Sequence, residues 1–144
     1  MDFQQSFNRN LFFLHLKNGE VIKSEFTFFP FPRIEKKQKI NQLFIDSLLD
    51  IAVNKIFTIY QKPRSRDFID LYFILKPKKW TIGELLKKAR IKFDWYIDPL
   101  QLGTQFLKVK ELKDYPKMIK KVKHEDWQNF FIGEAVEFKK DVFE

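Results

Sequence analysis

Two short apolar runs near the start of the chain have the character of β-strands. Leu11 to Leu16 and Glu20 to Phe29 flank Lys17-Asn18-Gly19, and an Asn-Gly pair favours a hairpin because both positions tolerate positive φ. Side chains alternate along the second run, which places successive residues on opposite faces. One face would carry Ile22, Ser24, Phe26 and Phe28, and the other Val21, Lys23, Glu25 and Thr27. The pattern predicts an antiparallel hairpin with Glu25 on the polar face.

Helical spacing replaces alternation beyond Pro30 and Pro32, which end the second strand. Residues 33–40 then form a basic connector. The predicted helices run from about Ser47 to Gln61, from Arg66 to Leu75, from Thr81 to Arg90, from Asp98-Pro99 onward, and from His124 to Lys140. We therefore predict an α+β fold in one domain, with a hairpin and connector over residues 1–40 and mainly helices over residues 41–144.

Composition narrows the possible chemistry. A chain of 144 residues with 44% hydrophobic content can build one core. It has no cysteine and only His15 and His124, which excludes disulfides, cysteine-based zinc sites and thiol nucleophiles and makes a histidine triad improbable. No signal-peptide pattern and no apolar run of about 18 residues is present, so we expect a cytoplasmic protein without membrane contact.

Charge is unevenly distributed along the chain, whose net charge is +8. Residues 74–123 hold 14 basic and 5 acidic side chains, a local +9, whereas residues 124–144 hold 2 and 6, a local −4. A basic segment of this kind can bind a phosphate backbone. Solvent-exposed lysines on helix faces that bind no partner would give the same pattern.

Charged residues interrupt two of the predicted helices. Lys55 falls within the apolar arc of the first, which contains Leu48, Ala52, Ile56 and Ile59. Asp67 and Asp70 lie three apart on one face of the second, which is apolar nearly all round, and we expect Asp70 to be the more enclosed. Buried carboxylates need cationic or metal partners. The nearest candidates are Lys55, Arg64 and Arg66.

Two interpretations fit this constellation. A structural ion-pair network between two helices would satisfy the carboxylates without chemistry. Alternatively, the helices line a polar pocket for a nucleotide, with a lysine on phosphate and an aspartate that positions the lysine, a metal or a reacting hydroxyl.

The stretch DIAVNKIFTIYQKPRSRDFIDLYFIL, residues 50–75, resembles the AbiEii/AbiGii-type toxin nucleotidyltransferases. That family has a helix with an Asp-Ile-Ala lead-in and a lysine, followed by Arg/Lys-Asp-x-x-Asp at the start of the next helix. Upstream, IKSEFTFFPFPRI resembles the family's strand with a third carboxylate, and downstream YPKMIKKV fits its C-terminal pattern. The resemblance covers about residues 11–131.

The resemblance implies roles for particular residues. Lys55 would contact nucleotide phosphates, with Arg64 and Arg66 beside it, Asp67 or Asp70 would be needed for activity, and Glu25 would stand for the third acidic residue near the metal. Such enzymes transfer a nucleotidyl group from a nucleoside triphosphate, with Mg²⁺, to an acceptor such as tRNA, in toxin-antitoxin or phage-defence systems.

The family's Gly-Ser turn and Asp-x-Asp pair, which bind two magnesium ions, are absent, so the chain resembles the C-terminal two-thirds of such an enzyme. It would be half of a split enzyme, the product of a truncated gene, or a degenerate relative that only binds. We expect Mg²⁺ and a nucleoside triphosphate to bind only if a companion chain supplies the Asp-x-Asp strand. Two non-catalytic functions stay open: a module that binds RNA or an antitoxin through residues 76–123, and a self-associating scaffold.

Overall fold

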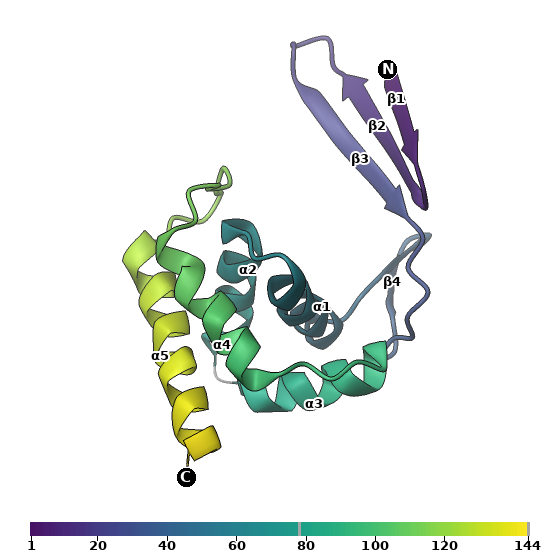
Figure 1. Ribbon diagram of the computed structural model, residues 1–144. Helices are drawn as coiled ribbons and strands as arrows, with labels where there is room; N and C mark the ends of the chain where they lie inside the picture. Colours follow the sequence, from purple (N-terminus) through teal and green to yellow (C-terminus); the bar gives the residue numbers. More distant parts are fainter. Residues whose placement is uncertain (78, 144) are drawn as a thin grey trace. The chain divides into compact units, whose positions relative to one another are not determined.

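The computed structural model describes the backbone of residues 1–77 and 79–143 and the side chains of residues 1–77 and 79–138. Its internal contacts divide the chain into two compact units, Met1–Phe31 and Pro32–Glu144. The first holds a small antiparallel sheet and the second contains the helices (Figure 1). The predicted α+β class is confirmed.

The first unit is a three-stranded antiparallel sheet in the order β1-β2-β3. The strands are β1 (Asp2–Ser6), β2 (Arg9–His15) and β3 (Val21–Thr27). The last two form the predicted hairpin. Strand β1 has no counterpart in the sequence-based prediction because Asp2–Ser6 is short and mostly polar, and pairing with β2 determines its conformation.

The loop between β2 and β3 depends on glycine at a single position. Leu16 N–H donates to the Glu20 carbonyl at 2.8 Å, and Gly19 has φ of +84°. Asn18 instead uses its side chain, whose Oδ1 accepts from Glu20 N–H at 3.1 Å. A three-residue loop of this kind needs the left-handed conformation only at its last residue. Thus Gly19 alone uses the tolerance for positive φ that favoured a hairpin here.

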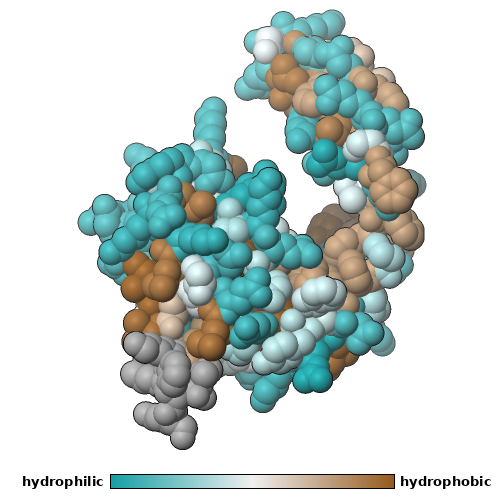
Figure 2. All heavy atoms as spheres, viewed as in Figure 1, coloured by the Kyte–Doolittle hydropathy of each residue, from teal (hydrophilic) through white to brown (hydrophobic). Residues whose placement is uncertain are grey.

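The two faces of this sheet differ in polarity, as the alternation predicts. Phe12 contacts Phe3 at 5.0 Å and Phe26 at 5.7 Å between ring centroids, so that one face is aromatic. Leu11 is buried on the opposite face. Much of the apolar surface of this unit is nevertheless exposed, as Figure 2 shows by the brown patches among its teal spheres.

The second unit begins with a short hairpin and continues with helices. Strands β4 (Gln38–Ile40) and β5 (Leu43–Ile45) pair antiparallel, with Asn41 in the turn at φ of +55°. Residues 33–40, expected as a connector, therefore include a strand, which is too short to show alternation. The helices are α1 (Leu48–Gln61), α2 (Ser65–Leu75), α3 (Ile82–Phe93), α4 (Pro99–Leu107) and α5 (His124–Phe143), with a 3-10 turn at Lys108–Lys110.

Local capping explains where these helices begin. The Ser47 and Asp98 side chains accept from the Asp50 and Leu100 N–H groups. Thr81 and Glu84 exchange side-chain bonds with each other's backbone N–H, which is the capping box predicted from their spacing. All the predicted helices are confirmed, with ends that differ by a few residues.

The core of the second unit lies among the helices and is rich in aromatic residues. Phe68 of α2 is fully buried and contacts three other buried rings, Phe106 of α4 and Trp127 and Phe131 of α5. From α1, Ala52, Ile56 and Ile59 are buried as predicted. Leu48 is 60% exposed because it lies at the margin of the buried arc of the helix. Packing around Phe68 orients α2, which carries the candidate site.

Candidate functional site

Helices α1 and α2 pack against each other (Figure 1). Their contact brings three charged residues together. The Lys55 ammonium of α1 lies 2.8 Å from Asp67 Oδ1 and 2.6 Å from Asp70 Oδ2, both on α2. A short turn around Pro63 joins the two helices, so the residues that meet here are close in the sequence. The structure thus assembles the three residues that the sequence pattern singles out, and the paired carboxylates do share one face.

Asp67 is the centre of this cluster. Its side chain is only 3% exposed, and each oxygen has a cationic partner: Oδ1 accepts from Lys55 and Oδ2 accepts from Arg64 Nε at 2.9 Å. Arg66 is exposed and makes no ion pair with any residue that the structure describes. Of the expected cationic partners, Lys55 and Arg64 are therefore confirmed, whereas Arg66 is not.

The expectation that Asp70 would be more enclosed than Asp67 is wrong. The Asp70 side chain is 50% exposed. The buried arc of α2 is centred near Phe68, with Leu71 and Leu75 beside it, and at 100° per residue Asp70 lies opposite that centre whereas Asp67 lies at its margin. Consequently α2 is not buried all round, and Lys55 likewise lies at the margin of the α1 core, with its side chain 24% exposed.

The protonation state of Lys55 follows from these contacts. Burial lowers the pKa of the ammonium, but hydrogen bonds to Asp67 and Asp70 and their negative charges outweigh burial and raise the pKa above its ordinary value of 10.5. The lysine is therefore cationic at neutral pH. An ammonium has three N–H donors, so the two carboxylates leave one donor for a further acceptor.

Asp114, in the loop between α4 and α5, contacts the first residue of α2, a link that the sequence-based prediction missed. Its Oδ1 accepts from the N–H of buried Ser65 at 3.1 Å and from the Ser65 hydroxyl at 2.9 Å. Burial raises the pKa of this carboxyl, but those bonds and the Arg64 charge outweigh burial and lower the pKa below 3.8. Only tertiary contact reveals this link, because 49 positions separate the two residues.

Asp50 and Lys92 form a buried ion pair that was also missed. Their side chains are 0% and 1% exposed, and the Lys92 ammonium lies 2.6 Å from Asp50 Oδ1. Asp50 also accepts from the Ile34 and Glu35 N–H groups at 2.9 and 3.1 Å, which ties the connector to α1 and α3. Burial raises the pKa of Asp50, but Lys92 and the two N–H donors outweigh it, so the pKa is lowered below 3.8.

The residues that the structure describes do not fit a divalent metal site. Among them, no three histidine or acidic side chains gather where they could hold a metal ion. Both oxygens of Asp67 are occupied by cations, and Glu25, proposed as a metal ligand, lies exposed on β3 with Arg9 and Lys23 at 3.6 and 3.7 Å. A magnesium ion would need several oxygen ligands, which these side chains do not provide.

The helices of the described part of the chain are too short or too polar to cross a membrane.

Helices α1 and α2, which hold the lysine, the paired aspartates and the arginine, lie within the range matched by a known protein family. The chain belongs to the AbiEii family, described as nucleotidyl transferase AbiEii toxin of type IV toxin-antitoxin systems, whose sequence model matches residues 19–139. The resemblance noted from residues 50–75 is thus confirmed.

A curated relative matches a smaller part of the chain. An uncharacterized protein of Aquifex aeolicus (strain VF5) is 35% identical over 74 residues, which are 50% of this chain and 36% of that protein. The chain therefore matches only about a third of that relative's length. No solved structure matches the chain.

Proposed function

We propose that this chain supplies one part of the nucleotide-binding and transfer site of an AbiEii-type nucleotidyltransferase toxin. The observation that carries the proposal is the position of Lys55, whose ammonium is held between Asp67 and Asp70 on the neighbouring helix. This geometry occurs in the stretch that resembles the family's central motif. In the complete enzyme, a nucleotidyl group would pass from a nucleoside triphosphate to an acceptor such as tRNA.

Each residue of the cluster has a distinct role in this proposal. Lys55 keeps one N–H donor for a phosphate oxygen, and Arg64, which uses only part of its guanidinium fork on Asp67, provides further donors. Asp67 positions both cations from its buried location. Asp70, half exposed, is the carboxylate that can accept a hydrogen bond from an acceptor hydroxyl.

Mg²⁺ enters this proposal only together with a companion chain. Because the described residues do not fit a metal site, the Asp-x-Asp strand that holds metal in the family would come from another polypeptide. An antitoxin is a further proposed partner, since the family is described as part of type IV toxin-antitoxin systems. Without the companion chain, we expect no transfer activity.

A pull-down of the tagged chain from its native cells, with intact-mass analysis, would identify the companion. The assembled pair would then be incubated with Mg²⁺, labelled nucleoside triphosphates and tRNA. We expect transfer by the assembly, loss of transfer in Lys55→Ala, and unchanged transfer in Lys62→Ala, a matched lysine at the C-terminal end of the same helix. Normal turnover by Lys55→Ala would overturn the assignment.

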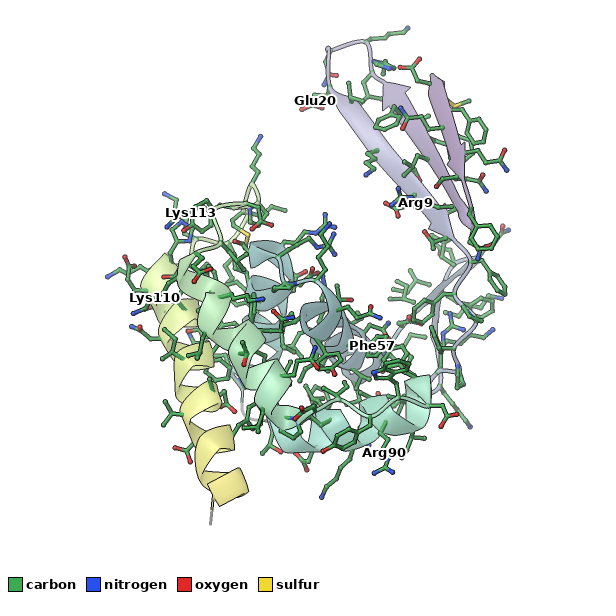
Figure 3. All side chains as sticks on the ribbon, in the orientation of Figure 1. Arg9, Glu20, Phe57, Arg90, Lys110 and Lys113 are labelled. Atoms are coloured by element: carbon green, nitrogen blue, oxygen red, sulfur yellow. The ribbon has the colours of Figure 1, made fainter. Side chains whose placement is uncertain are left out.

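A second candidate function is a binding module for RNA or an antitoxin. It is favoured by the exposed lysines between α4 and α5, of which Figure 3 labels Lys110 and Lys113. The exposed members of this basic loop are Lys108, Lys110, Lys113, Lys117, Lys120, Lys121 and Lys123. Lys78, which belongs to the predicted basic segment, lies outside the described residues.

Salt dependence separates the two functions. A phosphate-backbone binder loses affinity for tRNA steeply as salt rises. We expect such a module to weaken in Lys110→Glu/Lys113→Glu and to be unaffected by Lys55→Ala. Equal tRNA affinity in the wild type and the double variant would exclude this basic loop as the binding surface.

A further inference from the structure

Strand β3 is an edge strand with an open row of backbone groups. The sheet order β1-β2-β3 leaves one side of β3 without a neighbouring strand in its sheet. Hydrogen bonds from Leu16 N–H to the Glu20 carbonyl and from Phe28 N–H to the Asn8 carbonyl show that the even-numbered residues of β3 face β2. The N–H and C=O groups of the odd-numbered residues therefore face outward, at Val21, Lys23, Glu25 and Thr27.

The sequence of β3 is complementary to itself when read in the opposite direction. Ser24 is the middle residue of Val21–Thr27. If a second copy pairs antiparallel about a two-fold axis at Ser24, Lys23 lies opposite Glu25 of the other copy, and Glu25 lies opposite its Lys23. The same register places Ile22 opposite Phe26 and Val21 opposite Thr27. Apart from Ser24, which faces itself, each pair is then opposite in charge, apolar or β-branched, which are favourable cross-strand combinations.

Charge excludes the neighbouring symmetric registers. The outward groups belong to odd-numbered residues, so the hydrogen-bonded pairs must join odd-numbered residues of both copies. An axis at Lys23 would place two lysines opposite each other, and an axis at Glu25 would do the same with two glutamates, both of which are destabilising. Only the axis at Ser24 pairs opposite charges throughout the strand.

The existing contacts of Lys23 and Glu25 leave both side chains available. Glu25 lies 3.6 Å from Arg9 and 3.7 Å from Lys23 across exposed surface, and its side chain is 41% exposed. Ion pairs of this kind contribute little to stability. Across the proposed junction, the carboxylate would gain a directly opposed lysine.

Two further features favour a second copy as the occupant. Residues 1–31 contain three basic and three acidic side chains, so this unit is neutral, although the whole chain carries +8, and it would not repel its own copy. Phe26 and Ile22, exposed at 61% and 50%, would meet across the junction and extend the aromatic face formed by Phe3 and Phe12. Pairing would thus satisfy backbone groups and reduce exposed apolar surface together.

We propose that two copies of this chain associate by antiparallel pairing of their β3 strands about Ser24, with reciprocal Lys23–Glu25 ion pairs. The resulting sheet would run continuously from β1 of one copy to β1 of the other. This inference is independent of the proposed transferase function, because it uses no residue of the Lys55 cluster.

Charge reversal tests both the interface and its register. Analytical ultracentrifugation of the full chain, from about 10 µM to about 1 mM, would measure the dissociation constant. We expect a dimer for the wild type. Lys23→Glu and Glu25→Lys each place like charges opposite each other twice, so each variant alone should dissociate at least about tenfold more readily.

An equimolar mixture of the two variants is the decisive experiment. In the mixed pair, two glutamates of one chain meet two lysines of the other, and dimerisation should return. A double variant, Lys23→Glu/Glu25→Lys, should also dimerise, whereas a mixture of Lys110→Glu with Glu111→Lys, exposed charges in the second unit, should behave as the wild type.

Several outcomes would overturn the proposal. One is a wild type that stays monomeric throughout the concentration range. This outcome overturns the proposal also when a companion chain from the pull-down binds β3 instead and protects it from hydrogen exchange. Another is a dimer that neither single variant weakens. Failure of the mixture to dimerise, when circular dichroism shows both variants folded, would exclude the register about Ser24.

Discussion

Lys55 of α1 donates to Asp67 of α2 at 2.8 Å, and this contact connects two helices whose packing orients the whole cluster. Because Asp67 also accepts from Arg64 at 2.9 Å, one nearly buried carboxylate holds two cations. Asp70 contacts the same lysine from the solvent side. The two aspartates therefore differ in exposure although both contact Lys55: the Asp67 side chain is nearly buried and the Asp70 side chain is half exposed.

Substitution should separate the two aspartates energetically. Asp67→Asn removes the nearly buried charge that Lys55 and Arg64 share and leaves Lys55 with Asp70 alone, so we expect a loss of about 3 kcal/mol in the free energy of unfolding. Asp70→Asn, at an exposed position, should cost less than about 1 kcal/mol. Urea unfolding followed by tryptophan fluorescence measures both. Equal losses would contradict the difference in burial seen between the two carboxylates.

Loss of one partner of the buried Asp50–Lys92 pair should destabilise the fold more than Asp67→Asn does. Lys92→Met removes the ammonium and leaves the Asp50 carboxylate without its counter-charge in a site with 0% exposure. We expect a loss of about 3–5 kcal/mol. In Asp50→Leu/Lys92→Met neither charge remains, and the total loss should be smaller than the sum of the two single losses. Additive losses would show that the pair is not energetically coupled.

Acid should weaken the fold through Asp50. The pKa of this carboxyl is lowered on folding from its ordinary value of 3.8, so its contribution is fully present above that value and is lost as pH falls through the lower folded-state pKa. Asp50→Asn removes this titration. We therefore expect the stability of the variant to depend less steeply on pH below about 4 than that of the wild type. Parallel pH profiles in urea unfolding would contradict this assignment.

Asp114 should anchor the basic loop between α4 and α5 to the start of α2. Its carboxylate accepts two hydrogen bonds from Ser65. A hydrogen bond to a charged acceptor contributes at most about 3 kcal/mol to stability. We expect Asp114→Ala to speed amide exchange at Ser65 and in residues 111–123, with α5 unaffected. Glu111→Ala, an exposed acidic residue of the same loop, is the control. Unchanged exchange would mean that other contacts hold this loop.

Sequence patterns predicted the helices well because their signals are local. Thr81 with Glu84 and Asp98 with Pro99 specify helix starts within four residues, and the order of apolar positions indicates which face of α1 is buried. Strand β1 and the β4–β5 hairpin escaped prediction because each is only a few residues long and depends on its partner strand. The candidate site was predicted as a set of residues, but not its internal arrangement.

The amino-acid sequence by itself determined the α+β class, the family and the residues Lys55, Asp67 and Asp70, because spacing along a helix and short motifs are properties of neighbouring positions. Only the tertiary structure decided that Asp67 is buried and Asp70 exposed, that Lys92 meets Asp50, and that Asp114 meets Ser65. These contacts join residues from different elements. Their geometry follows from how the helices and loops pack against one another, which no local pattern specifies.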